Sequence, residues 1–99
     1  MRLELHPEAL AEFTESAQFY AGRQPGLELR FIAAVEVVFK LIKQSPQRGR
    51  FFEAEVRGRR TRVFPYTILY TIEPDYLLVI AVMHGHREPG YWRGRIKSK

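Results

Sequence analysis

Cysteine is absent from the 99-residue chain, which excludes disulfides, thiolate nucleophiles and cysteine-based zinc sites. Long apolar runs are absent too. The longest, Leu77 to Met83, has seven residues, against the roughly 20 that a membrane-spanning helix needs. Glutamates at positions 4, 8, 12 and 15 do not fit a signal peptide. We therefore expect a cytoplasmic protein without a membrane segment.

Motifs for nucleotide binding and serine catalysis are also missing. The sequence contains no GxGxxG and no GxxxxGK[ST], the glycine-rich patterns that cradle phosphates. Its serines lie outside any GxSxG context, and Asp75 is the only aspartate, so no serine triad is expected. We expect no cofactor.

Positive charge is concentrated in the second half of the chain. Residues 1–46 carry five basic and six acidic side chains, a net charge of −1, whereas residues 47–99 carry eleven and five, a net charge of +6. Twelve of the sixteen basic residues are arginine, whose guanidinium group pairs bidentately with phosphate or carboxylate. A polyanion or an acidic protein is the expected partner, and a charged surface that only maintains solubility is the alternative.

The chain length and a hydrophobic content of 45% predict one globular domain over residues 1–99. Residues 2–6 alternate as in a strand. Apolar spacing then predicts a helix from Pro7 that ends near Gly22, with Leu10, Phe13, Ala17 and Tyr20 on its inner face. A second helix is predicted from residue 27 to a stop at Pro46.

Extended structure is predicted for the remainder, with strands at 59–64, 66–72 and 77–83. The last of these is apolar on both faces, as in a central strand. The order of elements predicts an α+β fold: an antiparallel helical hairpin packs on one face of a mainly antiparallel, four- or five-stranded twisted sheet. A basic tail or short helix follows.

His84 and His86 stand at the end of the last predicted strand. Their i, i+2 spacing places both imidazoles on one face, where a histidine is suited to proton transfer near neutral pH. A metal would require a third ligand, for which His6, Glu53 and Glu55 are candidates without supporting spacing. Hydrogen bonding at the strand end is the favoured interpretation, and no metal is expected.

Arginines and aromatic residues of the second half form a candidate RNA-binding surface. Arg60 and Arg62, on one face of a strand, would stand about 7 Å apart, close to the phosphate spacing of a single strand. The tail could add Arg87, Arg93 and Arg95, and Tyr91 and Trp92 could stack bases. The alternative is a solvated sheet face onto which Tyr91 and Trp92 pack the tail.

Several segments resemble the RelE/ParE superfamily of bacterial toxins from type II toxin–antitoxin modules. They are LHPEALAEFTESAQFYAGRQPGLELRFIAAVE in the helical region, VRGRRTRVFPYTILYTIEPDYLLVIAVMHGHREPGYW in the sheet, and the order FPYTILY, AVMHGHR, PGYW. The FPY form and the PGYW ending are similar to the ParE-like, plasmid-stabilisation subgroup. The resemblance implies a toxin that a cognate antitoxin neutralises in a hetero-oligomeric complex and that arrests growth when released.

The superfamily implies two routes to growth arrest: RelE-like members cleave mRNA on the ribosome, and ParE-like members poison DNA gyrase. The nuclease pattern implies catalytic roles for Arg60 and Arg62 on the central strands, His84 at the end of the last strand, and Arg87 and Tyr91 after it. That chemistry, attack of a 2′-hydroxyl on the neighbouring phosphate, is metal-free. However, Thr67 stands where RelE-like nucleases carry an arginine, which argues against cleavage. A gyrase inhibitor would need no catalytic residue, and a non-toxic basic binding module is the third alternative.

Overall fold

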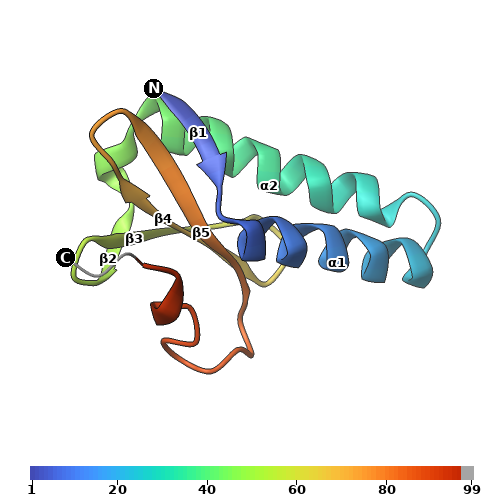
Figure 1. The fold of residues 1–99 in the computed structure, drawn as a ribbon. Coiled ribbons are helices and arrows are strands. Elements are labelled where there is room, and N and C mark those ends of the chain that lie inside the picture. Colours follow the sequence, from blue (N-terminus) through green and yellow to red (C-terminus); the bar gives the residue numbers. More distant parts are fainter. Residues whose placement is uncertain (97–99) are drawn as a thin grey trace.

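The computed structural model describes residues 1–96 and has two α-helices packed against a five-stranded sheet (Figure 1). The strand order is β1-β5-β4-β3-β2; β1 is parallel to β5, and the other neighbours are antiparallel. The predicted α+β architecture is confirmed. The elements along the chain are β1 (Arg2–Leu5), α1 (Pro7–Arg23), α2 (Leu27–Gln44), the 3₁₀ helix η1 (Pro46–Arg48), β2 (Arg50–Glu53), β3 (Val56–Arg60), β4 (Tyr66–Ile72), β5 (Tyr76–His84) and the 3₁₀ helix η2 (Arg93–Arg95).

The helical hairpin forms where the sequence predicts it. The ring nitrogen Nδ1 of His6 accepts a hydrogen bond from the Glu8 amide at 3.1 Å, and Pro7 occupies the first turn of α1. Two details differ from the prediction. Gly22 lies within α1, which ends at Arg23, and Leu10 is 53% exposed because Ala9 takes the buried position in this turn.

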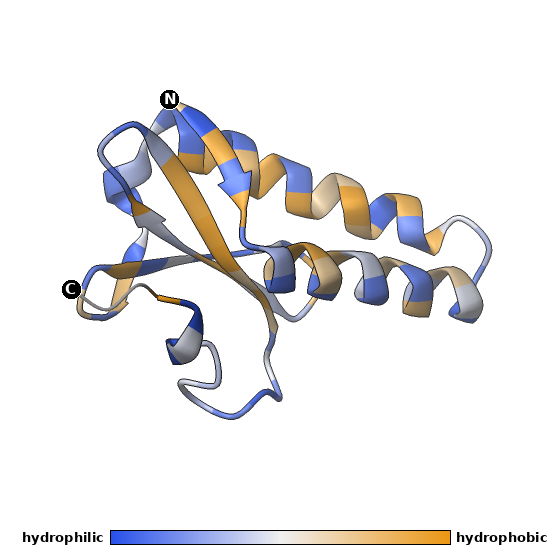
Figure 2. Cartoon of the chain, viewed as in Figure 1, coloured by the Kyte–Doolittle hydropathy of each residue, from blue (hydrophilic) through white to orange (hydrophobic). Residues whose placement is uncertain are grey.

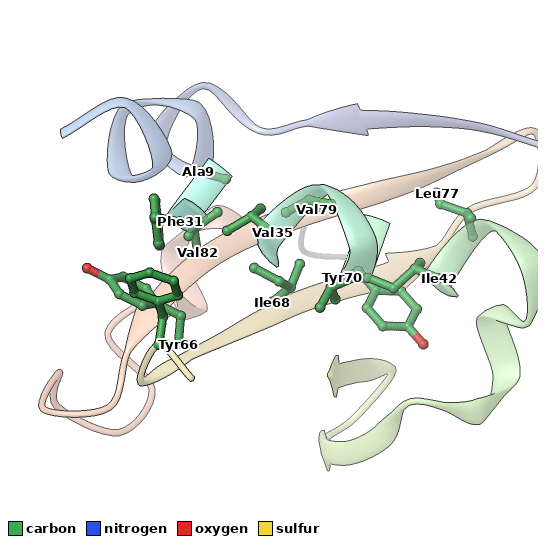
Figure 3. Packing of buried hydrophobic residues seen from close by; sticks show 12 residues of the cluster. Ala9, Phe31, Val35, Ile42, Tyr66, Ile68, Tyr70, Leu77, Val79 and Val82 are labelled. Carbon is green, nitrogen blue, oxygen red and sulfur yellow. The ribbon is translucent and has the colours of Figure 1, made fainter. Parts of the chain in front are cut away.

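The main core lies between the helical hairpin and one face of the sheet (Figure 3). Phe31 of α2 is fully buried at its centre and contacts four aromatic rings, those of Phe13, Tyr20, Phe64 and Tyr66, at centroid distances of 4.9–5.9 Å. Along both helices a stripe of hydrophobic residues, orange in Figure 2, alternates with blue hydrophilic ones, and the buried residues of both helices belong to the main core. Burial of this apolar stripe is the main stabilising contribution to the hairpin.

The C-terminal segment covers the opposite face of the sheet. Trp92 is 3% exposed and packs with Leu69 of β4 and Ile80 of β5 in a second core cluster. The pairing of β4 with β5 shifts its register between Leu69 and Tyr70. The apolar residues of β5 contribute to both core clusters, one on each face of the sheet. The apolar run at 77–83 therefore is a central strand, as predicted. The expectation that Trp92 offers a free face for a base is wrong, because this ring is part of the core.

Strand β3 is shorter and earlier than predicted. It ends at Arg60, and residues 61–65 form a loop before β4. The hydroxyl of Thr61 donates to the Phe64 carbonyl at 2.6 Å, and Val63 has a positive φ of 71°. This tight turn replaces the predicted extension to Phe64, so Arg62 is a loop residue and not a strand residue.

Candidate functional site

Two surface hollows lie beside the helical hairpin. The α1 hollow has a volume of about 360 Å³ and is lined by α1 and the ends of β4 and β5, including Glu12, Tyr66 and His84. The α2 hollow, of about 630 Å³, is lined by α2 together with β3 and the loop after it. No lining residue is common to both. The rings of Tyr20 and Phe64, whose centroids are 5.0 Å apart, stand at the boundary between them.

His84 ends β5 and lies opposite Tyr66 of β4 in the sheet register. Its ring contacts the Tyr66 ring at 5.2 Å and the His86 ring at 5.1 Å, both edge to face. The backbone amide of His86 donates to the ring nitrogen Nδ1 of His84 at 3.0 Å. The two imidazoles therefore lie together, as their spacing predicts, and His84 makes the strand-end hydrogen bond that the sequence analysis favoured.

Glu12 of α1 is the centre of a polar cluster, the Glu12 cluster, with Arg87, Tyr91 and Arg95. Its carboxylate accepts from the Tyr91 hydroxyl at 2.6 Å and from Arg95 at 2.9 and 3.1 Å, and lies 3.8 Å from Arg87. The side chains of Glu12 and Arg95 are only 13% and 8% exposed. Glu12 was not predicted as a site residue, since nothing in the local sequence indicates that a helical glutamate binds residues 79 and 83 positions away.

The Glu12 cluster also provides hydrogen-bond partners for backbone groups at the free edge of β5. Strand β1 pairs with β5 only over residues 76–79. Beyond that point, the Val82 amide donates to Glu12 at 2.9 Å, and Arg95 donates to the Ile80 carbonyl at 3.0 Å. Two side chains thus replace the missing strand partner, and this pairing anchors the C-terminal segment to α1.

Tyr91 is engaged on its ring as well as at its hydroxyl. The guanidinium of Arg87 lies 3.8 Å from the ring centroid, and that of Arg95 lies 5.0 Å away. Burial and the hydrogen bond to Glu12 raise the pKa of the Tyr91 phenol, so it remains a proton donor to Glu12. A second phenol at the α1 hollow behaves similarly: burial and a hydrogen bond with Tyr66 raise the pKa of Tyr20 to about 12.

The structure distributes the predicted site residues between the two hollows. His84 and Arg87 line the α1 hollow, and Tyr91 adjoins it through Glu12. Arg60 and Arg62 are both exposed and line the α2 hollow. The expectation of one basic surface is therefore wrong. Arg87 and Arg95 face Glu12, and Arg93 pairs with Glu53 at 2.7 Å, which lowers the pKa of that carboxyl group.

Within residues 1–96, no three histidine, aspartate or glutamate side chains gather as a metal site would require. His6 caps α1, and Glu53 binds Arg93, so neither joins the pair of His84 and His86. Over the same part of the chain, neither helix has the length and apolar character needed to cross a bilayer.

Comparison with known proteins identifies relatives of this fold. Residues 3–89 match the family model described as the ParE toxin of the type II toxin–antitoxin system parDE. A solved structure entitled "Chromosomal ParDE TA system from P. aeruginosa" superposes with a TM-score of 0.76 and 17% sequence identity, covering 85% of this chain and 95% of that one. No protein of curated function matches.

Proposed function

Because this chain belongs to the ParE toxin family of type II toxin–antitoxin systems, we propose that it arrests growth by binding and poisoning DNA gyrase. Inhibition by binding requires a complementary surface and no catalytic residue of the toxin itself. Recognition of the free toxin by a cognate antitoxin would then control its activity.

The separation of the candidate nuclease residues supports binding over RNA cleavage. Metal-free cleavage needs unpaired cations beside the proton-transfer group, because negative charge accumulates on the phosphorane. Around His84, the nearby cation Arg87 faces Glu12, and that carboxylate itself lines the same hollow. Arg60 and Arg62 line the other hollow. A phosphate beside His84 would therefore meet a carboxylate and lack the pair of arginines that the nuclease pattern requires.

One observation favours the nuclease alternative. His84 and Arg87 line the same hollow, and the Tyr91 hydroxyl is held beside it. Three of the five residues that the nuclease hypothesis requires therefore lie near one another. An RNA cleavage role for His84, Arg87 and Tyr91 is thus the second candidate function, and it makes a different prediction for the replacement of His84.

The variant His84→Ala tests the choice between these mechanisms. If the toxin acts by binding gyrase, we expect growth arrest to remain within about threefold of the parent, because no proton transfer by the imidazole is required. If His84 transfers a proton during RNA cleavage, its loss should lower activity by roughly 10²–10⁴-fold. The measurement is viable-cell count after controlled expression without antitoxin.

Two readouts from the same cultures complete the test: the positions of mRNA cleavage, and DNA breaks trapped in gyrase complexes. The proposal predicts trapped gyrase with intact mRNA for both the parent and His84→Ala. The variant His86→Ala is a matched control, since it removes a neighbouring exposed imidazole. If the parent cleaves mRNA without trapping gyrase, and if His84→Ala loses this cleavage while His86→Ala keeps it, the proposal is rejected in favour of the nuclease.

A further inference from the structure

Strand β2 and the segment before it form a basic edge of the sheet, away from both hollows. β2 is the outermost strand, next to β3 (Figure 1). Residues 46–60 carry five arginines and two glutamates, a net charge of +3. One of these glutamates, Glu53, pairs with Arg93 at 2.7 Å. Within residues 1–96, no ion pair is formed by Arg48, Arg50 or Arg57. This edge therefore keeps positive charge that the fold does not neutralise.

Phe51 is one of two exposed aromatic residues of β2, with 59% of its surface open to solvent. The guanidinium of Arg57 lies over its ring, 3.9 Å from the centroid. Nη1 of Arg57 donates to the carbonyls of Gln47 at 2.7 Å and of Gly49 at 3.2 Å, which fixes the guanidinium in this position. Because both acceptors are neutral, the stacked pair of arginine and ring remains positively charged.

Phe52, the second exposed ring, is 43% exposed and points to the other face of the strand. It lies directly over Gly58 of β3: a Cβ atom at that glycine would stand 2.4 Å from the ring. A glycine is therefore required here for the ring to rest against the sheet. The guanidinium of Arg50 lies 5.9 Å from the ring centroid. The edge thus presents two partly exposed rings, each beside an arginine.

The shape of β2 favours a nucleic acid over an added protein strand. β2 has only four residues, and its pairing with β3 shifts in register between Phe51 and Glu53. Short edge strands and bulges both discourage the addition of another strand. Guanidinium groups beside exposed rings instead suit a nucleic acid, since its phosphates pair with arginine and its unstacked bases stack on aromatic rings.

We propose that this edge, the β2 surface, binds DNA that has unstacked bases, and its role in growth arrest rests on the proposed action on gyrase. The surface consists of Arg48, Arg50, Phe51, Phe52 and Arg57. The rings stack on bases and the arginines contact the flanking phosphates. Bases inside an intact duplex are stacked on one another, whereas DNA that gyrase has cut has an interrupted stack. A ligand shifts an equilibrium toward the state that it binds more tightly, so a toxin that prefers cut DNA favours the broken intermediate.

Fluorescence anisotropy of the purified toxin tests the proposal without gyrase. The probes are an intact DNA duplex and the same duplex with a gap of about four nucleotides in one strand. We expect the gapped duplex to bind at least about tenfold more tightly, and Phe51→Ala or Phe52→Ala to weaken its binding about tenfold, the usual effect of removing a stacking ring. Arg48→Gln should weaken binding to both probes alike and reduce the salt dependence by about one phosphate contact.

Matched controls separate stacking from other effects. Phe51→Tyr keeps the ring and should bind the gapped duplex within about twofold of the parent. Phe19→Ala removes a 56% exposed phenylalanine of α1 that also lies beside an arginine, Arg23, at 5.6 Å. It should bind both probes within about twofold of the parent, because it lies outside the β2 surface. The urea midpoint of each variant verifies that it is folded in the assay.

Equal affinity of the parent for the gapped and intact duplexes would overturn the proposal, as would parental affinity in both Phe51→Ala and Phe52→Ala. Tighter binding when the gap holds ribonucleotides would reject DNA as the ligand. A dimer that dissociates in Phe51→Ala, measured by sedimentation, would assign the surface to a second copy of the chain and also overturn it.

The gyrase test is separate, since the parent and each variant are also assayed for trapped gyrase–DNA complexes. A parent that binds gapped DNA but traps no gyrase rejects gyrase as the target and supports the β2 surface as a DNA site. Trapped gyrase with a toxin that does not bind the gapped duplex rejects the β2 surface alone.

Discussion

Replacing Glu12 by alanine is expected to lower the free energy of unfolding by about 3–5 kcal/mol, the usual cost of leaving one member of a buried ion pair alone. The variant leaves the Arg95 guanidinium, whose side chain is 8% exposed, without its closest counter-charge. It also removes the acceptors of the Tyr91 hydroxyl and the Val82 amide. A domain of this size has only about 5–15 kcal/mol of stability, so the variant should lie close to unfolding at 37 °C.

Urea denaturation followed by tryptophan fluorescence measures this effect, because Trp92 lies in the segment that the Glu12 cluster anchors. Glu15→Ala is the control: it removes an exposed carboxylate from the same helix, and its effect should stay within about 0.5 kcal/mol. Glu12→Gln retains hydrogen-bonding capacity without the charge and should fall between the two. A Glu12→Ala variant as stable as Glu15→Ala would show that the cluster does not hold the C-terminal segment.

Replacing Phe31 by alanine is also expected to lower the free energy of unfolding by about 3–5 kcal/mol, the usual effect of removing a buried phenylalanine side chain. Its ring is fully buried and contacts four other aromatic rings, including Tyr20 and Phe64 at the boundary between the two hollows. The space left behind cannot close easily, because those rings come from both the helical hairpin and the sheet. Both hollows should therefore lose their shape along with stability.

Phe19→Ala is the matched control for Phe31→Ala. Phe19 is a phenylalanine of the same hairpin but is 56% exposed, so its removal should cost less than about 1 kcal/mol. Thermal unfolding followed by circular dichroism compares the two variants. An equal loss of stability in both would contradict the central position of Phe31 in the core.

Much of the fold can be predicted from periodic patterns of apolar residues in short stretches of the sequence. Helical spacing predicted the second helix to within a residue of α2, and the doubly apolar run predicted β5 as a central strand. Leu10 shows the limit of this method. It fits the helical stripe as well as Ala9 does, yet only the packing of the sheet against α1 decides which of them is buried.

The site was harder to predict because its contacts join distant parts of the chain. The local sequence does not distinguish the arginines of the second half from one another. In the structure, Arg87 and Arg95 pair with Glu12, and Arg93 pairs with Glu53. Arg60 and Arg62 form no ion pair within the described residues. Likewise, the alternating pattern at 59–64 predicts a strand, whereas the Thr61 hydroxyl and the turn at Val63 end it at Arg60. Neither outcome has a local sequence signal.

The proposed mechanism is tested most directly with purified components: this toxin, DNA gyrase, ATP and relaxed plasmid. After detergent and protease treatment, binding that poisons the enzyme should yield linear plasmid in proportion to toxin concentration and only when gyrase is present. The same toxin should leave mRNA on translating ribosomes intact. Supercoiling that continues without linear product, together with cut mRNA, would contradict the account.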